Sequence, residues 1–553
     1  MDRRKFVGSV AAGSAAAVLT GCGSDSGSPA TVATTVPTGG GFVDPDPLAD
    51  FHASGRTVAV ATTAREATDA AFDVLERGGN AADAYIAAAV TQAVVEVGLV
   101  SIGGAFGMTF FDAATGQTAS ASGGLGPAAA EPYDFDRFDA ATLTGRAMPI
   151  PGYIAGVHAG HTEFGRLEWG GLFDAAIGYA REGVAASDVI VSSASRSPRA
   201  TRFPEGQAIW MRGGRYLRAG ERLIQSDIGR TLQAVAEGGP EAFYEGEFAK
   251  SYVARAGSDG GLLTLDDMSG WRDRQRVRRG EPEGDYRGHQ VWAPTAGLLT
   301  YALHLSEAAD LRGSGPAASS AESVYRQMRI IEEVFLSTTD YDEDTHARFV
   351  DPAYARERVD FVIESPMRDL NLDALFNTSF IVVRDADGNC AWGTHSINTP
   401  TAFGAGIVVD GVYAAHAISR AHVYGSGGTA NGIGTNFALF RDGRPRAVFG
   451  SPGFGFVHGP YQAGTAVMEW GLEPMEAVAA PRFGFPSGAT FGQPFLEGHY
   501  EESVYEGLEA RGVPHVRANA SVSTGLVGAL VIDEEGVLHA AQDPRRAGFA
   551  RAV

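Results

Sequence analysis

The pattern of apolar and polar positions predicts long helices alternating with paired strands. Residues 63–77 carry apolar side chains at helical spacing, and Gly78-Gly79-Asn80 ends that helix. The next helix, from Ala81 to about Val95, is apolar on nearly every side, so we expect it to lie inside a large core. Further helices are expected at residues 171–182, 227–236, 321–335, 461–470 and 501–511.

Between these helices the pattern becomes that of strands joined by short polar turns that contain glycine. Residues 108–112 and 118–121 flank one such turn, and the arrangement recurs at residues 380–392, 436–449 and 527–541. Repeated antiparallel hairpins separated by long helices favour an α+β fold, in which helices sandwich the sheets, over a doubly wound parallel sheet.

The first residues have the features of an export signal. Arg3-Arg4 precedes a short apolar, alanine-rich stretch, and this stretch ends at Leu19-Thr20-Gly21-Cys22. Such a sequence is typical of a twin-arginine signal peptide and is too short for a confident transmembrane helix. The last four residues resemble a bacterial lipobox, which implies a lipid on Cys22; a simple cleaved signal with an incidental cysteine is the alternative. We therefore predict a signal peptide at residues 1–22, a flexible tether at residues 23–48, and an exported protein anchored to the cell membrane by lipid.

Composition and charge narrow the possible partners. The hydrophobic fraction of 44% and the charged fraction of 20% are those of an ordinary globular enzyme. With 44 basic and 66 acidic residues, the net charge of −22 repels nucleic-acid phosphates and anionic lipid. We expect no nucleic-acid partner, and membrane contact only through the N-terminal lipid.

The cysteines and histidines predict neither a disulfide framework nor a metal site. If Cys22 carries lipid, Cys390 has no partner, and its apolar surroundings predict a buried structural thiol. The 13 histidines are not grouped with carboxylates or cysteines at metal-ligand spacing. We therefore expect no metal and no cofactor.

The candidate chemistry centres on Thr378, which stands at the head of a predicted strand. Ser396 and Asn398 return on the partner strand. If the chain is cut after Asn377, Thr378 gains a free α-amine that can act as the general base for its own hydroxyl. Taken alone, a threonine here is more often only a β-branched residue that opens a strand. The interpretation therefore depends on the rest of the chain.

Ten short motifs, in order along the chain, resemble those of the γ-glutamyltranspeptidase family. They lie at residues 78–84, 103–108, 151–156, 180–183, 243–246, 260–267, 284–288, 450–453, 480–483 and 543–545. One such motif would be weak support, but ten in the same order are strong.

The resemblance implies an N-terminal-nucleophile (Ntn) hydrolase with an αββα sandwich made as one precursor. The precursor would split itself between Asn377 and Thr378 into a large subunit, residues 49–377, and a small subunit, residues 378–553, of 553 − 377 = 176 residues. Thr378 would then attack a small-molecule amide and form an acyl-enzyme, which passes its acyl group to water or to an amine acceptor.

The resemblance also assigns roles to individual residues. Ser396 matches a threonine that supports the nucleophile, and Asn398 matches an asparagine that binds substrate. Gly453 matches the first glycine of the oxyanion pair, whose N–H groups stabilise the tetrahedral intermediate. Phe454 stands where the second glycine is expected, so its backbone N–H is kept while its ring changes the pocket.

The substrate clamp departs from the family pattern. Gly123 fills the place of the arginine that grips the glutamate head, Arg420 replaces an aspartate that pairs with the α-amine, and Gly432-Ile433 replaces a pair of serines. Each charge-assisted hydrogen bond contributes about 1.5–3 kcal/mol, so the loss of two or three weakens γ-glutamyl binding by several powers of ten. The sequence therefore favours an acyl group that lacks the α-ammonium, with a carboxylate that Arg420 could bind.

Two functions remain open on the sequence. The first is an autoprocessing amide hydrolase or acyltransferase, and the second is an inactive, uncleaved surface lipoprotein that binds a ligand or partner. Loss of the clamp supports the second, whereas the retained nucleophile and oxyanion residues favour the enzyme.

Overall fold

The structure is a computed structural model that describes most of the chain after the predicted tether. The described residues are 48–134, 140–293, 297–337, 343–367, 378–399, 402–417, 436–452, 457–485, 494–518, 525–546 and 548–553. Contacts divide the chain into Met1–Asp46 and Pro47–Val553, and every described residue belongs to the second unit. The predicted signal peptide, Cys22 and nearly all of the predicted tether lie outside the described residues.

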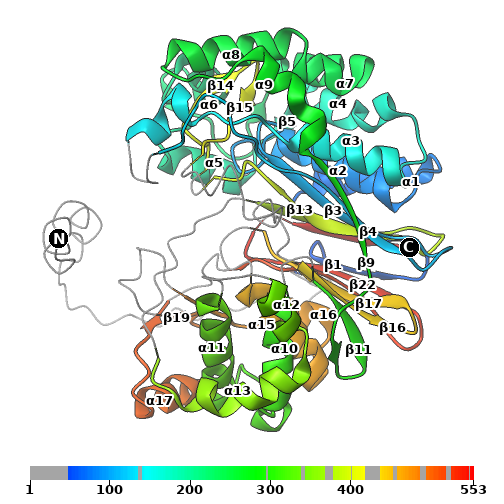
Figure 1. The fold of residues 1–553 in the computed structure, drawn as a ribbon, viewed down its shortest axis with the longest axis vertical. Helices are drawn as coiled ribbons and strands as arrows, with labels where there is room; N and C mark the ends of the chain where they lie inside the picture. The colour runs from blue at the N-terminus through cyan, green and yellow to red at the C-terminus, as the bar shows by residue number, and fades with distance from the viewer. Residues whose placement is uncertain are drawn as a thin grey trace, which may run out of the picture. The chain divides into compact units, whose positions relative to one another are not determined.

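Two antiparallel sheets of seven strands each form the centre of the unit Pro47–Val553 (Figure 1). The first sheet contains, in spatial order, β23 (Phe549–Ala552), β2 (Ala59–Thr62), β12 (Ser379–Arg384), β13 (Cys390–Ser396), β3 (Ala105–Phe111), β4 (Thr118–Gly123) and β9 (Gln275–Gly280). The second sheet contains β1 (His52–Gly55), β22 (Leu538–Gln542), β21 (Gly528–Ile532), β17 (Arg444–Gly450), β16 (Asn436–Arg441), β11 (His289–Trp292) and β10 (Asp285–Tyr286).

Helices cover the outer face of each sheet (Figure 1). The helices on the side of the first sheet are α1 (Arg65–Glu76), α2 (Ala81–Val95), α3 (Tyr153–Phe164), α4 (Asp174–Glu182), α7 (Ser226–Tyr244) and α8 (Glu247–Ser258). Those on the side of the second sheet are α10 (Leu298–Ala308), α11 (Ala321–Leu336), α12 (Glu343–Phe349), α13 (Pro352–Glu364), α15 (His458–Trp470), α16 (Pro474–Ala479) and α17 (Glu502–Ala510).

Shorter elements complete the described unit. The remaining α-helices are α5 (Asp188–Arg196), α6 (Pro204–Trp210) and α9 (Leu265–Ser269). The short strands are β5 (Val184–Ala185), β6 (Met211–Arg212), β7 (Arg215–Tyr216), β8 (Arg222–Leu223), β14 (Val408–Val409), β15 (Val412–Tyr413), β18 (Phe483–Gly484), β19 (Phe495–Leu496) and β20 (Val516–Arg517).

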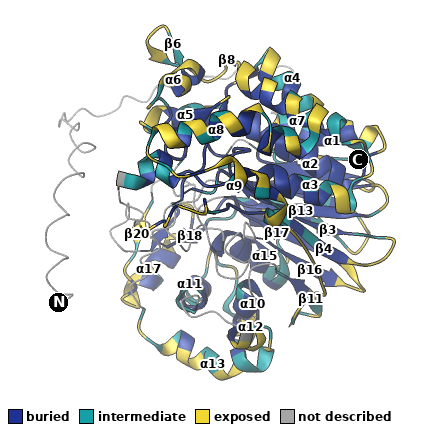
Figure 2. Ribbon diagram, turned by 45° about the horizontal axis from the view of Figure 1, so that its top comes forward, coloured by how far each residue is buried: buried dark blue, intermediate teal, exposed yellow. Residues whose placement is uncertain are grey.

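The central strands are buried on both faces, which explains their continuous apolar sequences (Figure 2). On β12, Phe380 and Val382 belong to the core between the two sheets, whereas Ile381 and Val383 pack toward the helices. A separate core lies between the second sheet and its own helices. Three apolar interfaces therefore separate four layers, and the predicted αββα sandwich is confirmed.

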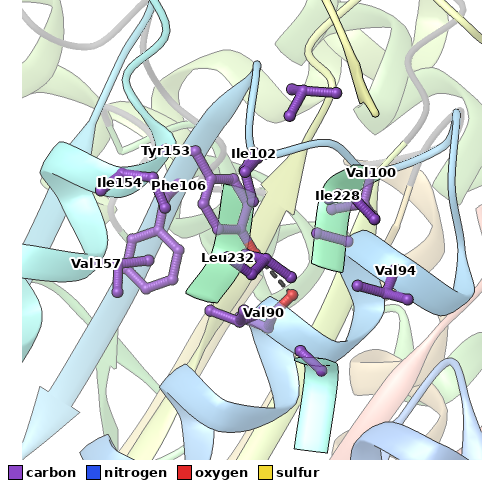
Figure 3. Packing of buried hydrophobic residues seen from close by; sticks show 14 of the residues in the cluster. Val90, Val94, Val100, Ile102, Phe106, Tyr153, Ile154, Val157, Ile228 and Leu232 are labelled. Carbon is purple, nitrogen blue, oxygen red and sulfur yellow. Dashed lines mark hydrogen bonds between the residues drawn. The ribbon is translucent and has the colours of Figure 1, made fainter. Parts of the chain in front are cut away.

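Helix α2 is buried along its whole length, as its uniform apolar sequence predicts. The side chain of Asn80 accepts hydrogen bonds from the backbone of Ala82 and Asp83, and the Asp83 side chain accepts one from the Asn80 N–H. Figure 3 shows Val90 and Val94 of α2 in the cluster that also contains Ile228 and Leu232 of α7. The capped N-terminus and the packed side chains of α2 together fix the position of its C-terminal end.

The other predicted helices and hairpins are confirmed with shifted ends. The helix expected at residues 227–236 is the first part of α7; the backbone leaves helical geometry at Gly239, whose φ is +68°, and a further short helical segment with Pro240 reaches Tyr244. The helix expected from residue 63 begins instead at Arg65, because the backbone of Ala64 is extended, with φ −147° and ψ 135°. The four predicted hairpins correspond to β3–β4, β12–β13, β16–β17 and β21–β22.

Candidate active site

Thr378 lies directly before β12, beside the end of the neighbouring strand β13. Its Oγ1 donates a hydrogen bond to Ser396 Oγ at 3.3 Å. Both side chains are almost fully buried, with 6% of Thr378 and 1% of Ser396 exposed. The register of the hairpin pairs Ser379 with His395. Thr378 and Ser396, one residue further along each strand, therefore lie side by side. The structure therefore brings the predicted nucleophile and its predicted supporting hydroxyl together.

Asn398 contributes its backbone to the same cluster. Its N–H donates to Ser396 Oγ at 2.7 Å, and its φ of +57° turns the chain sharply after β13. Asparagine tolerates this left-handed conformation better than most residues. The Ser396 hydroxyl thus accepts hydrogen bonds from both Thr378 and Asn398. These two hydrogen bonds fix its position beside the side chain of Thr378.

Glycines let other backbone segments approach these strand ends. A Cβ on Gly104 would overlap the carbonyl oxygen of Ser396, so the segment before β3 packs directly on the end of β13. A Cβ on Gly450, the last residue of β17, would collide with the ring of Phe380, and one on Gly528 would lie 2.5 Å from that ring. The two sheets therefore approach closely around Phe380, two residues after Thr378.

The predicted oxyanion residues follow this close approach in the chain. Ser451 and Pro452 continue from the end of β17, and both are buried. Gly453 and Phe454 come next and lie outside the described residues, as do Asn377, Arg420 and the segment 432–433.

Gly123, the last residue of β4, has no space for a side chain. A Cβ there would overlap the carbonyl oxygen of Gly152 and lie 2.5 Å from the backbone nitrogen of Gly156. The start of α3 thus occupies the volume that any larger residue at this position would need. An arginine could stand there only if α3 moved away from β4.

Sequence reasoning missed a buried ion pair that touches the nucleophile's segment. Glu96, which caps the C-terminal end of α2, is 4% exposed and accepts a hydrogen bond from Ser379 Oγ at 2.5 Å. Arg546 donates to Glu96 Oε1 at 2.5 Å and to the carbonyl oxygen of Thr378 at 3.3 Å. The one indication of this ion pair in the sequence was a single acidic residue inside the apolar stretch Val94–Val97.

His395 and Cys390, both on β13, are too buried to take part in acid–base chemistry at ordinary pH. The His395 ring lies among Tyr85, Phe106 and Tyr153, and burial lowers its pKa to about 3, so it stays neutral. Cys390 is buried, as predicted, and burial raises the pKa of its thiol to about 12. Neither side chain provides a base for Thr378.

The described ranges contain neither a cluster of metal ligands nor a helix that could span a membrane. In those ranges, no three His, Cys, Asp or Glu side chains are grouped so that they could hold a metal ion. No described helix combines the length and apolar character needed to cross a membrane.

Two antiparallel sheets packed face to face between layers of helices form the αββα sandwich of the Ntn hydrolases. A family profile described as Gamma-glutamyltranspeptidase matches residues 67–419 and 435–553. The chain therefore belongs to the γ-glutamyltranspeptidase family and is an enzyme of that family, with hydrolase or transferase chemistry.

Individual relatives agree with this assignment. The chain is 30% identical over 380 residues to a glutathione hydrolase proenzyme of Pseudomonas aeruginosa. The aligned region covers 64% of this chain and 66% of that enzyme. It is 27% identical to the acylase ACY 1 proenzyme of Pseudomonas sp. strain SE83, over 92% of this chain and 96% of that one. The crystal structure of a cephalosporin acylase from Bacillus halodurans shares the fold, with a TM-score of 0.72 and 22% identity over 94% of this chain and 99% of that one.

Proposed function

We propose that this chain cleaves itself before Thr378 and then works as an amide hydrolase or acyltransferase with Thr378 as its nucleophile. In the cleavage, the Thr378 hydroxyl attacks the carbonyl carbon of Asn377, the peptide nitrogen leaves as the new α-amine, and water hydrolyses the resulting ester. The products are residues up to 377 and a small subunit of 553 − 377 = 176 residues that begins with Thr378.

In the mature enzyme, the α-amine acts first as base and then as acid. It takes the proton of Thr378 Oγ1 as that oxygen attacks the substrate amide, and it gives a proton to the departing amine. The acyl group remains as an ester on Oγ1 until water or an acceptor amine attacks it. An unperturbed α-amine has a pKa of about 7.7–8.0, so enough of it is neutral for this role near pH 7.

One observation carries the proposal: Thr378 Oγ1 lies 3.3 Å from Ser396 Oγ in a buried position at the head of an inner strand. The Ser396 hydroxyl, oriented by the Asn398 N–H at 2.7 Å, holds the attacking oxygen in place. We assign oxyanion stabilisation to the backbone N–H groups of Gly453 and Phe454, and substrate contact to Asn398.

We also propose that the acyl group lacks the α-ammonium of a γ-glutamyl group. Position 123 holds glycine and has no room for a gripping arginine. Arg420 would repel an ammonium and attract a carboxylate. One relative is named an acylase, which supports the proposal that members of this family differ in the acyl group they accept. The substrate class is therefore a small amide, such as a dicarboxylic acid monoamide.

We place the mature enzyme outside the cytoplasm, held to the membrane by lipid on Cys22. The support is the order of twin arginines, apolar stretch and lipobox-like residues in the sequence, followed by the polar tether at residues 23–48. No cofactor enters the mechanism, because the nucleophile, base and oxyanion donors all come from the chain.

A panel of p-nitroanilides tests this function. We expect faster release of p-nitroaniline from glutaryl-p-nitroanilide than from γ-glutamyl-p-nitroanilide, and a small-subunit mass that rises by one acyl group during turnover. Thr378→Ser should keep both signals, since serine also supplies a hydroxyl and an amine, whereas Thr378→Ala should lose both. Faster turnover of the γ-glutamyl compound would contradict the proposed acyl specificity. Absence of turnover with every compound would favour the inactive ligand-binding lipoprotein.

A further inference from the structure

The Glu96 carboxylate is a buried charge that several groups hold in place. Its Oε2 accepts hydrogen bonds from Ser379 Oγ at 2.5 Å and Thr63 Oγ1 at 2.6 Å, and its Oε1 accepts from Arg546 at 2.5 Å. Thr63 Oγ1 in turn accepts from Gln92 at 2.7 Å, which directs its own proton toward Glu96. An acidic group is unfavourable at the C-terminal end of a helix, where Glu96 caps α2, so this carboxylate depends on its partners.

These contacts form a closed ring around the nucleophile's backbone. Ser379, directly after Thr378, binds Glu96, while Arg546 binds both Glu96 and the carbonyl oxygen of Thr378 at 3.3 Å. Glu96 and Thr63 precede the proposed cleavage point, whereas Ser379 and Arg546 follow it. The ring therefore joins both future subunits at the residue that would carry the new amine.

We infer that Glu96 and Arg546 form a positioning pair that fixes the backbone of Thr378 and sets the electrostatic environment of its α-amine. The inference rests on the proposed function, because it concerns the amine that cleavage releases. While both partners are present, their charges cancel next to the nucleophile. Removing only one partner leaves the other as an uncompensated buried charge close to the amine.

The two single substitutions should therefore shift the amine in opposite directions. In Glu96→Gln, the unpaired Arg546 disfavours a second positive charge and lowers the pKa of the amine. In Arg546→Met, the unpaired Glu96 favours the ammonium and raises that pKa. Burial raises the pKa of Glu66 on α1 and of Tyr153 on α3, and the negative charge of Glu96 adds to both shifts. Neither residue is substituted in these variants.

The test is the pH dependence of kcat/KM for glutaryl-p-nitroanilide, measured on fully cleaved enzyme. The acidic side of this pH profile, its acid limb, should move down by about one pH unit in Glu96→Gln and up by about one unit in Arg546→Met. At a fixed pH on the acid limb, each shift changes kcat/KM by about tenfold. The double variant should return close to the wild-type limb. Ser379→Ala, which leaves both charges in place, should lower kcat without moving the limb.

A matched control separates this role from a general effect of losing a buried carboxylate. Glu469 is 5% exposed and accepts hydrogen bonds from Arg287 at 3.1 Å on the side of the second sheet, so Glu469→Gln should leave the limb unchanged. Unchanged limbs in Glu96→Gln and Arg546→Met, in cleaved enzyme, would overturn the inference and leave the proposed function standing. An uncleaved wild-type chain would overturn both.

Self-cleavage gives a second readout if the single variants do not mature. Intact mass should then show cleavage lost in Glu96→Gln and Arg546→Met but recovered in the double variant, because the charges are again balanced. Loss of cleavage in all three, with the Glu469→Gln protein still cleaved, would show that the two residues serve the fold alone and would contradict the positioning pair.

Discussion

At the scale of single residues, the arrangement of two hydroxyls decides what the site can do. Ser396 accepts hydrogen bonds from Thr378 Oγ1 and from the Asn398 N–H, so it fixes both the nucleophile and the turn that follows β13. A hydrogen bond of this kind contributes about 0.5–1.5 kcal/mol. A hydroxyl with two such roles should be replaceable by threonine and not by alanine.

We therefore expect Ser396→Ala to lower kcat/KM by about tenfold or more, with a melting temperature close to that of the wild type. Steady-state kinetics on cleaved enzyme and a thermal melt check this expectation. Ser396→Thr is the matched control, since it restores the hydroxyl. Equal activity of the alanine and threonine variants would show that this hydroxyl does not support the nucleophile.

His395 makes the stability of the protein sensitive to acid. Its pKa of about 3 in the folded state is below the value of about 6.5 in the unfolded chain. The unfolded state therefore binds a proton first as pH falls, and the stability that this difference provides at pH 7 is progressively lost below about pH 6.5. The loss from this group should reach no more than about 3.5 kcal/mol at pH 4.

Urea unfolding at pH 7 and pH 4 measures this loss, on the Thr378→Ala background so that a single chain unfolds. His395→Phe should show a smaller fall in the free energy of unfolding between the two pH values, because phenylalanine does not titrate. An identical fall in both proteins would rule out His395 as a source of the acid sensitivity.

At the scale of elements, the strands around Phe380 are packed without spare volume. Its ring lies against Gly450 of β17 and Gly528 of β21, so the second sheet touches the first next to the nucleophile. Adding a methyl group at such a contact forces side chains or backbone to shift, at a cost of about 1–3 kcal/mol.

Gly450→Ala should accordingly lower the free energy of unfolding by about 1–3 kcal/mol, and it should also reduce activity because β17 leads toward Gly453. Adding Phe380→Leu should recover part of the stability, since a smaller side chain leaves room for the methyl group. Gly178→Ala is the control, because a Cβ there meets nothing within 4 Å inside α4, and it should be neutral or slightly stabilising. Equal effects of the two alanine substitutions would contradict the close contact.

Local sequence patterns were enough to predict most elements but not their long-range partners. Turns with glycine and continuous apolar strands identified the four hairpins, and the uniform apolar character of α2 indicated its burial. Periodicity cannot show that β1 pairs with β22, or that Glu96 meets Arg546 across 450 positions of the chain. Thr378 and Ser396 were predictable together because one short hairpin joins them. Nothing in the sequence indicated that the hydroxyl of Ser379 binds Glu96.

At the scale of the described unit, the segments before and after Thr378 are interleaved rather than separate. In the first sheet, β12 pairs with β2 and β13 pairs with β3. In the second sheet, β1 pairs with β22 and β11 pairs with β16. Each proposed subunit thus supplies strands to both sheets, and neither has a complete core of its own.

Cleavage should therefore leave the two subunits together. We expect them to co-elute in size-exclusion chromatography without denaturant and to separate only under conditions that unfold both sheets. The uncleaved Thr378→Ala chain should elute at the same volume, which makes it the control for shape. Dissociation of the two pieces in native buffer would contradict the shared sheets.

The most direct test is the N-terminal residue of the smaller chain in purified, active protein, read by Edman degradation and intact mass. The proposed chemistry requires threonine 378 there, in a fragment of 176 residues, and a single uncleaved chain in the Thr378→Ala variant. Activity from a protein whose bond between residues 377 and 378 remains whole would leave the nucleophile without its base and would contradict the mechanism.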